Sequence, residues 1–159
     1  MTDYEQPPQP AEPAADLRDL DRLVGTWKVS GPDISGDVTY EWMEGRFFLL
    51  QHVDFVHGGN HILGMEVIGH LQPFGEAPSP EIRSRFYDSV GNTLDYVYEI
   101  EGDTLTIWGN EKGSPAYYRG VFSENDTVNA GAWVYPGGGG YDSTMTKMST
   151  GRRSRGKRK

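Results

Sequence analysis

Residues 92–109, NTLDYVYEIEGDTLTIWG, contain two short alternating segments on either side of a tight turn. Gly102-Asp103 is a favoured pair for a two-residue hairpin turn, and this turn pairs Glu101 with Thr104. The pairing gives an apolar face of Leu94, Tyr96, Tyr98, Ile100, Leu105 and Ile107, and an opposite face of Asp95, Val97, Glu99, Glu101, Thr104, Thr106 and Trp108. Such a separation predicts a sheet that is buried on one side. Tyr96 and Tyr98 then point inward, where their hydroxyl groups need a partner or a ligand.

The same period of two continues on both sides of this hairpin. About ten strands are expected, at residues 26–30, 37–43, 46–56, 61–70, 81–88, 93–101, 104–109, 116–123, 128–135 and 141–148. Turn signals rich in Gly, Pro, Asn and Asp separate them, and no helical pattern is long enough for a βαβ crossover. A long meander with little helix has to close in order to remove its edges. The predicted fold class is therefore all-β: a closed antiparallel up-and-down barrel of about ten strands with one short N-terminal lead-in helix.

The lead-in helix is expected after Asp16, which we interpret as its N-cap, because Leu17, Leu20 and Leu23 follow at helical spacing. Residues 1–15 are rich in proline and are expected to form a disordered tail. Residues 16–149 form the predicted barrel domain. Residues 150–159 are expected to form a disordered basic tail.

Residues 136–140, PGGGG, raise the alternative of a phosphate-binding loop. Such a loop needs a lysine followed by Ser or Thr and the N-terminus of a helix. Here Tyr141 and a further alternating segment follow instead. The glycines therefore indicate a hairpin connection at the mouth of the barrel, and a nucleotide enzyme is not expected.

Composition narrows the possible partners and locations. The chain of 159 residues has a net charge of −8 although its last nine residues hold six basic side chains, so the body is strongly acidic and nucleic acid is not expected as a partner. There is no cysteine, and no apolar run is long enough to span a membrane. The first residues lack the pattern of a secretory signal, so a cytoplasmic location is predicted.

A family resemblance is carried by Gly25-Thr26-Trp27, which open the first strand directly after the short helix. This arrangement resembles the G-x-W signature of the calycin superfamily, which contains lipocalins and fatty-acid-binding proteins, and ten strands fit the fatty-acid-binding type. Residues 25–147 are similar to an uncharacterised bacterial family, a domain of unknown function often found in actinobacteria. The resemblance implies that Trp27 is a structural plug at the closed end, with Arg119 or Lys147 as a cation stacked on its indole.

A haem-binding branch of the same superfamily also begins with a G-x-W strand, and it ligates iron through a histidine near the C-terminal end of the domain. This chain has no histidine after His70. The resemblance therefore implies no haem, and no cofactor is expected. The histidines at positions 52, 57, 61 and 70 are clustered in sequence, but their spacing matches no defined metal site.

His52 and Glu66 are candidates for acid–base chemistry, depending on strand register. A four-residue loop at residues 57–60 places His52 opposite Met65 and Glu66 on the other face beside Gln51. A three-residue loop at residues 58–60 instead pairs His52 with Glu66, where the carboxylate would orient the imidazole as a general base. A shift of one residue moves every side chain to the other face, so the sequence leaves both registers open.

The strand at residues 81–88 carries the same ambiguity. A two-residue turn after it places Arg83, Arg85 and Tyr87 beside Tyr96 and Tyr98, and Arg85 would then bind a ligand carboxylate. A three-residue turn with a bulge at Gly91 instead places Ile82, Ser84 and Phe86 inside, and their apolar content favours it.

These observations predict that the barrel binds a small apolar or amphipathic molecule, aromatic or carboxylate-bearing, in its interior. Tyr96 and Tyr98 are the expected wall residues, joined by Tyr117 or Tyr118 according to parity. Arg85, His52 and Glu66 are the expected polar anchors. Two alternatives stay open: an isomerase, cyclase or dehydratase that uses His52 and Glu66, and an interaction module whose barrel is filled by its own side chains.

Overall fold

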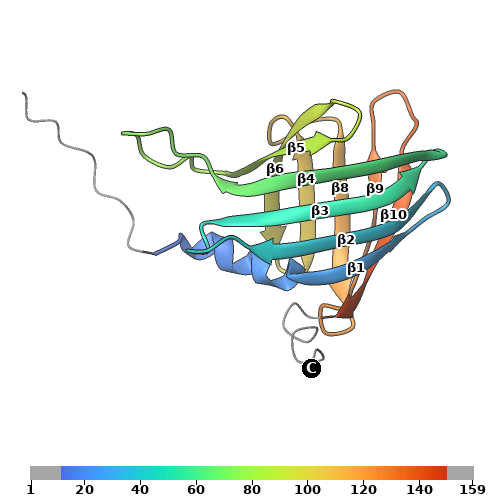
Figure 1. Ribbon diagram of the computed structural model, residues 1–159, viewed down its shortest axis with the longest axis horizontal. Coiled ribbons are helices and arrows are strands. Elements are labelled where there is room, and N and C mark those ends of the chain that lie inside the picture. Colours follow the sequence, from blue (N-terminus) through green and yellow to red (C-terminus); the bar gives the residue numbers. More distant parts are fainter. Residues whose placement is uncertain (1–11, 150–159) are drawn as a thin grey trace, which may run out of the picture.

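The computed structural model describes residues 12–149 as a closed antiparallel barrel in which each strand pairs with its neighbours in sequence and β1 pairs with β10 (Figure 1). The strands are β1 (Gly25–Ser30), β2 (Ile34–Trp42), β3 (Phe48–His57), β4 (Asn60–His70), β5 (Ile82–Asp88), β6 (Thr93–Glu101), β7 (Thr104–Gly109), β8 (Tyr117–Ser123), β9 (Val128–Val134) and β10 (Tyr141–Ser149). The predicted fold class is confirmed. The expectations for residues 1–11 and 150–159 lie outside the described residues.

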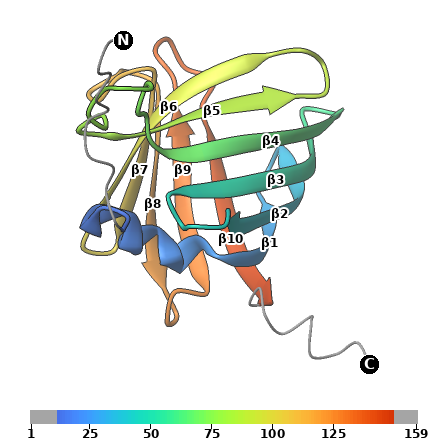
Figure 2. The same cartoon turned by 60° about the vertical axis from the view of Figure 1, so that its left-hand side comes forward.

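The lead-in helix is the 3₁₀-helix η1 (Ala15–Leu23), which lies across one end of the barrel (Figure 2). It buries Leu17, Leu20 and Leu23, whose spacing of three residues matches the 3₁₀ repeat and keeps all three on one face. We call this end of the barrel the closed end. Within residues 12–149 no helix is long and apolar enough to cross a bilayer.

The prediction that Asp16 caps this helix is wrong. The N-cap is Ala14, whose side chain has no capping oxygen. The carboxylate of Asp16 lies 2.8 Å from Nε2 of His70, and Nδ1 of the same ring lies 2.7 Å from the carbonyl oxygen of Ser79. Asp16 therefore ties η1 to the end of β4.

Trp27 is fully buried next to η1, as the resemblance implied. Its Nε1 donates a hydrogen bond of 2.7 Å to the carbonyl oxygen of Leu23. Nζ of Lys147 lies 4.9 Å from the centroid of the indole, so Lys147 is the stacked cation. The assignment of Arg119 to this role is wrong, because Arg119 lies on the outer face over the ring of Tyr117.

Gly120 in β8 keeps space for a buried polar pair inside the barrel. The hydroxyl group of Tyr118 donates a hydrogen bond of 2.6 Å to Oδ1 of Asn129, and both side chains are buried. A Cβ atom on Gly120 would collide with both oxygens of this hydrogen bond. Nδ2 of Asn129 forms no hydrogen bond within the described part of the chain.

We expect Gly120→Ala to lower the free energy of unfolding by roughly 1–3 kcal/mol, because the new methyl group forces this pair out of place. Val121→Ala is the matched control, since Val121 is exposed on the outer face of the same strand, and it should cost about 0.5 kcal/mol or less. Urea denaturation followed by circular dichroism measures both values. Equal losses in the two variants would contradict the proposed packing role.

Candidate functional site

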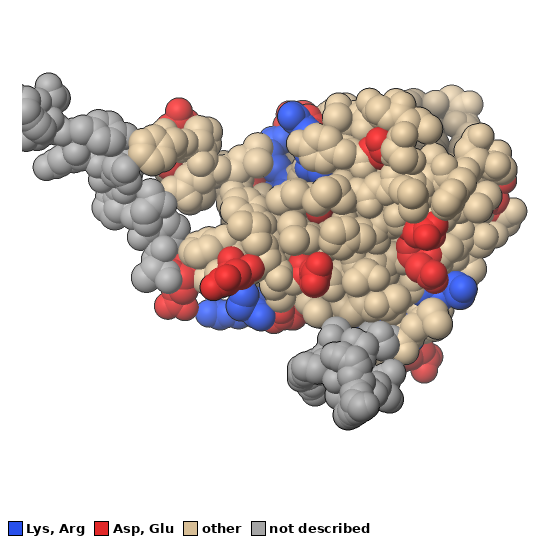
Figure 3. Space-filling view, in the orientation of Figure 1, with Lys and Arg blue, Asp and Glu red and all other residues tan. Residues whose placement is uncertain are grey.

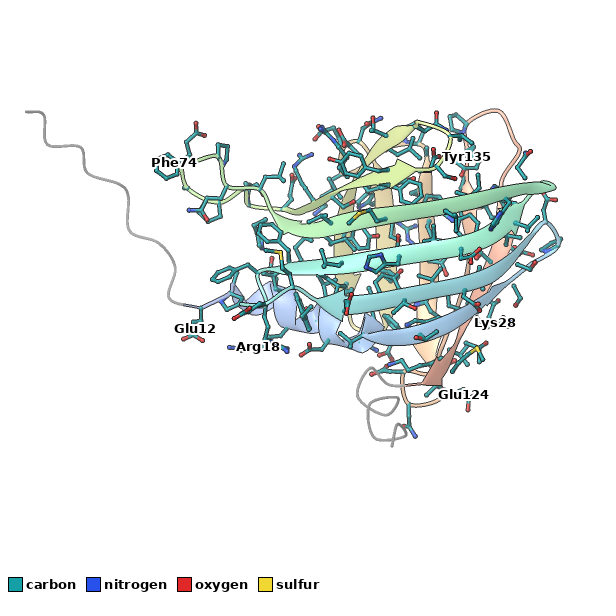
Figure 4. The ribbon with its side chains drawn as sticks, viewed as in Figure 1. Glu12, Arg18, Lys28, Phe74, Glu124 and Tyr135 are labelled. Atoms are coloured by element: carbon teal, nitrogen blue, oxygen red, sulfur yellow. The ribbon has the colours of Figure 1, made fainter. Side chains whose placement is uncertain are left out.

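The barrel encloses a cavity of about 350 Å³ between its closed end and the opposite end. All ten strands contribute at least one side chain to its lining. Tyr135, Tyr141, His57 and Leu94 line it near the loops at residues 135–140, 58–59 and 89–92, and each of these side chains is partly exposed. We call this the open end. Figure 4 places Tyr135 there, away from Arg18 on η1.

Aromatic rings form much of the cavity wall. The indole of Trp133 in β9 contacts Tyr96 and Tyr118, with ring centroids 5.9 and 5.5 Å apart. Towards the open end it is nearly parallel to Tyr135, at an interplanar angle of 11° and a centroid distance of 6.2 Å. These rings contribute a large apolar area to the wall of the lumen.

A shallow depression of about 560 Å³ adjoins the open end. It shares His57, Trp133, Tyr135 and Tyr141 with the internal cavity and is completed by Gly139 and Gly140 of the glycine-rich loop. Gly137, Gly138 and Gly139 all have positive φ, so the segment is a reversal between β9 and β10, as predicted. The depression and the internal cavity therefore meet at these four shared side chains.

Glu66 is the acidic group deep in the cavity, and its exposed fraction is only 3 %. Its Oε2 accepts a hydrogen bond of 2.9 Å from the hydroxyl group of Tyr98 and a shorter one from Oγ of Ser84. Burial raises the pKa of Glu66 to about 7, because the loss of water outweighs these two hydrogen bonds, which favour the charged form. Near pH 7 the protonated and ionised forms of the carboxyl group are therefore present in similar amounts.

Other hydroxyl groups lie close to this acid. The phenol of Tyr40 accepts a hydrogen bond of 2.9 Å from Nε2 of Gln51. The hydroxyl group of Tyr96 forms no hydrogen bond with any residue from 12 to 149 and lines the cavity. Burial, and after it the charge of Glu66, raises the pKa values of both phenols, so both stay protonated at neutral pH.

The β3–β4 register decides the position of His52. The strands pair His57 with Asn60 and Gln51 with Glu66, which is the register of the 57–60 loop. His52 is opposite Met65 and lies on the outer face, with Nε2 3.4 Å from Oε2 of Glu41. The structure therefore does not bring His52 and Glu66 together, and the expected acid–base pair is not formed.

The β5–β6 register removes Arg85 from the interior. Ser84 pairs with Tyr96 and Arg85 with Asp95, so Ser84 points inward, as the favoured register predicted. On the outer face, Nε of Arg85 donates a hydrogen bond of 2.7 Å to Asp95. Arg85 is therefore not an interior anchor for an anion.

The expected wall residues divide between the two faces of the sheet. Tyr96 and Tyr98 line the cavity, whereas Tyr117 is turned outward against Trp108, at a centroid distance of 5.3 Å. Tyr118 takes the inward position. Sequence reasoning did not select Tyr40 or Trp133, although both lie at alternating positions of predicted strands.

The four histidines have separate surroundings. His61 lies 2.7 Å from Asp54 on the outer face, and the ring of His57 packs against Tyr141 with centroids 4.5 Å apart. Among the residues that the structure describes, no group of three or more His, Cys, Asp or Glu side chains is placed to hold a metal ion.

The fold and the site together define a closed ten-stranded antiparallel barrel with an aromatic lumen and a buried acid, an architecture consistent with a calycin-like barrel. The chain matches no protein-family model and no curated protein.

Proposed function

We propose that the barrel binds a small amphipathic molecule in its lumen. The observation that carries this proposal is the cavity of about 350 Å³, a volume within the usual range of roughly 300–1,000 Å³ for small-molecule sites. Its wall is mostly aliphatic and aromatic, with a few polar groups gathered around Glu66. This combination provides apolar area for affinity and hydrogen bonds for orientation.

The cavity also bears on the two alternatives. An interaction module with a filled barrel would leave no such space, so the hollow interior favours small-molecule binding. The enzyme alternative required His52 beside Glu66, and these side chains lie on opposite faces of the sheet. A calycin-like relationship, membership of the uncharacterised bacterial family and a cytoplasmic location stay proposals, and the binding function needs no cofactor.

A carboxylate-bearing ligand is no longer favoured. That expectation depended on Arg85 inside the barrel, and Arg85 is on the outer face. The described residues that line the cavity include Glu66 and Asp88 but no lysine or arginine. An anionic head group would therefore meet a carboxyl group instead of a cation.

Two valine substitutions on β3 test lumen binding. Val53 points into the cavity, whereas Val56 on the same strand is 43 % exposed on the outer face. We expect the uncharged fluorescent probe N-phenyl-1-naphthylamine to bind the wild-type protein with enhanced emission. Val53→Trp should weaken binding by at least about tenfold, because the indole occupies the lumen, and tenfold corresponds to about 1.4 kcal/mol.

Val56→Trp is the control and should bind the probe like wild type. Circular dichroism establishes that both variants are folded. Absence of probe binding by the wild-type protein, or equal binding by the two folded variants, would refute a ligand site in the lumen.

A further inference from the structure

We infer that Glu66 and the aromatic side chains around it form a subsite for a protonated nitrogen, so that the lumen selects amphipathic amines. This inference rests on the proposed function, because it names the chemical class of ligand for the same cavity. Three features of the site support it: an uncompensated acid, an acceptor oxygen without a donor, and a wall of aromatic faces.

The first feature is the missing counter-ion of Glu66. Three cationic side chains, two from β5 and one from the β7–β8 loop, pair with acids outside the lumen. The pairs are Arg85 with Asp95, Arg83 with Glu111, and Lys112 with Glu99. No lysine or arginine in residues 12–149 lines the cavity. A buried carboxylate without a cation is costly, and a charge is normally buried only with a partner. A ligand ammonium group would supply that partner.

The second feature is the unequal use of the two carboxylate oxygens. Oε2 accepts both hydrogen bonds, from Tyr98 and Ser84. Oε1 accepts none from the described residues, and Glu66 lines the cavity. The hydroxyl group of Tyr96 also lacks a partner there. An ammonium group carries up to three donors, which suits an arrangement of Oε1 and one or two phenol oxygens.

The third feature is the aromatic wall. Tyr98, Tyr96, Tyr118 and Trp133 all line the same cavity as Glu66. The negative faces of such rings attract a cation, and the attraction increases when water is excluded. Aromatic rings in the same cavity as one acid therefore favour an organic cation over an anion or a neutral alcohol.

The titratable groups that face Glu66 also favour a positively charged ligand. They are Tyr40 from β2, Tyr96 and Tyr98 from β6 and Tyr118 from β8, with His57, Asp88, Tyr135 and Tyr141 nearer the open end. Gln51 and Ser84, from the two strands paired with β4, are uncharged. Outside the barrel, acidic side chains are spread over the face formed by β1 to β4 (Figure 3), and the whole chain has a net charge of −8. A negative surface raises the local concentration of cations.

Three probes with one indole ring and one two-carbon spacer test this selectivity: tryptamine, tryptophol and indole-3-propionic acid. They differ in carrying an ammonium group, a hydroxyl group or a carboxylate. Isothermal titration calorimetry with the full-length protein at pH 8 should give the tightest binding for tryptamine. We expect at least a tenfold preference over tryptophol, and the weakest binding for the acid.

The pH dependence provides a second readout. Tryptamine stays protonated below pH 8 and needs the ionised form of Glu66, whose pKa is about 7. Its affinity should therefore fall by about tenfold for each pH unit below 7, and binding should release a proton. Tryptophol should show no such slope.

Glu66→Gln should reduce the preference for tryptamine over tryptophol to less than about threefold and remove the pH slope. Glu41→Gln is the control, because Glu41 is exposed on the outer face, and it should keep both. Tryptamine binding no tighter than tryptophol, or tightest binding of the acid, overturns the inference. If N-phenyl-1-naphthylamine still binds in that case, the proposed function stands; if neither it nor any indole binds, both proposals fail.

Discussion

Trp27→Ala should lower the free energy of unfolding by about 3–5 kcal/mol, the range expected for truncating a large buried aromatic residue. Trp27 has an exposed fraction of 0 % and closes the barrel beneath η1. Its loss leaves a cavity and removes the hydrogen bond from Nε1 to the carbonyl oxygen of Leu23. It also removes the ring over which Lys147 lies, and the lost hydrogen bond is one of the contacts that hold η1 to the barrel.

Trp108→Ala is the matched control. Trp108 lies on the outer face of β7, is only partly buried, packs against Tyr117 and donates a hydrogen bond of 2.9 Å to Glu99. It should cost about 1 kcal/mol, the centre of the distribution for single substitutions. Urea denaturation followed by far-ultraviolet circular dichroism measures both, because tryptophan fluorescence changes with either substitution. Similar losses in the two variants would show that Trp27 is not the plug of the closed end.

The role of Trp27 was predictable, but its cation was not. The G-x-W motif after a short helix pointed to a plug, and both Arg119 and Lys147 were available. The choice depends on the pairing of Trp27 with Lys147 between β1 and β10, which are the first and last strands. Periodicity along a strand does not reveal a contact between segments so far apart in sequence.

The predicted faces of the strands are correct where the sequence specifies the length of the turn. Gly102-Asp103 fixes the pairing of β6 with β7, and the predicted faces of residues 94–108 are confirmed. The glycine-rich turn between β3 and β4 allowed two registers, and the observed one separates His52 from Glu66. Because side chains alternate with a period of two, a single undetermined residue in a turn decides which polar groups enter the lumen.

The candidate site was predictable only where the sequence determined which face of the sheet each residue occupies. The inward orientation of Tyr96 and Tyr98 was predicted correctly from the hairpin. Glu66 was named as a candidate, but its partners Ser84 and Tyr98 come from β5 and β6, and their approach depends on the registers of β4 with β5 and of β5 with β6. The pKa of Glu66 is raised by burial within the whole barrel, and the local sequence does not reveal this burial.

Glu66 should make the protein less stable as the pH rises from about 4.5 to about 7. The folded state holds the proton of Glu66 up to a pKa of about 7, whereas the unfolded chain releases it near 4.5. The folded state therefore binds more protons in this interval, so the free energy of unfolding decreases with pH. The full loss corresponds to roughly 3 kcal/mol and is complete above the folded pKa.

Glu66→Gln should remove this loss. Its side-chain oxygen can still accept hydrogen bonds from Ser84 and Tyr98, and its amide group is uncharged at every pH. We expect the variant and the wild-type protein to be similarly stable near pH 4.5, and the variant to be more stable by up to about 3 kcal/mol at pH 8. Urea denaturation at half-unit pH intervals gives this difference directly.

The comparison isolates Glu66 from the other acids. Hydrogen-bond partners lower the pKa values of Asp88, Asp95 and Glu99. The contribution of these acids to the free energy of unfolding is therefore lost as the pH falls. This loss is the same in the wild-type protein and in Glu66→Gln. Glu101→Gln, at an exposed position of the β6–β7 hairpin, should keep the wild-type pH dependence. The difference in free energy of unfolding between Glu66→Gln and wild type should grow between pH 5 and pH 8. If it does not, the carboxyl group is hydrated or already paired with a cation. The lumen would then lack the uncompensated acid on which amine selectivity depends.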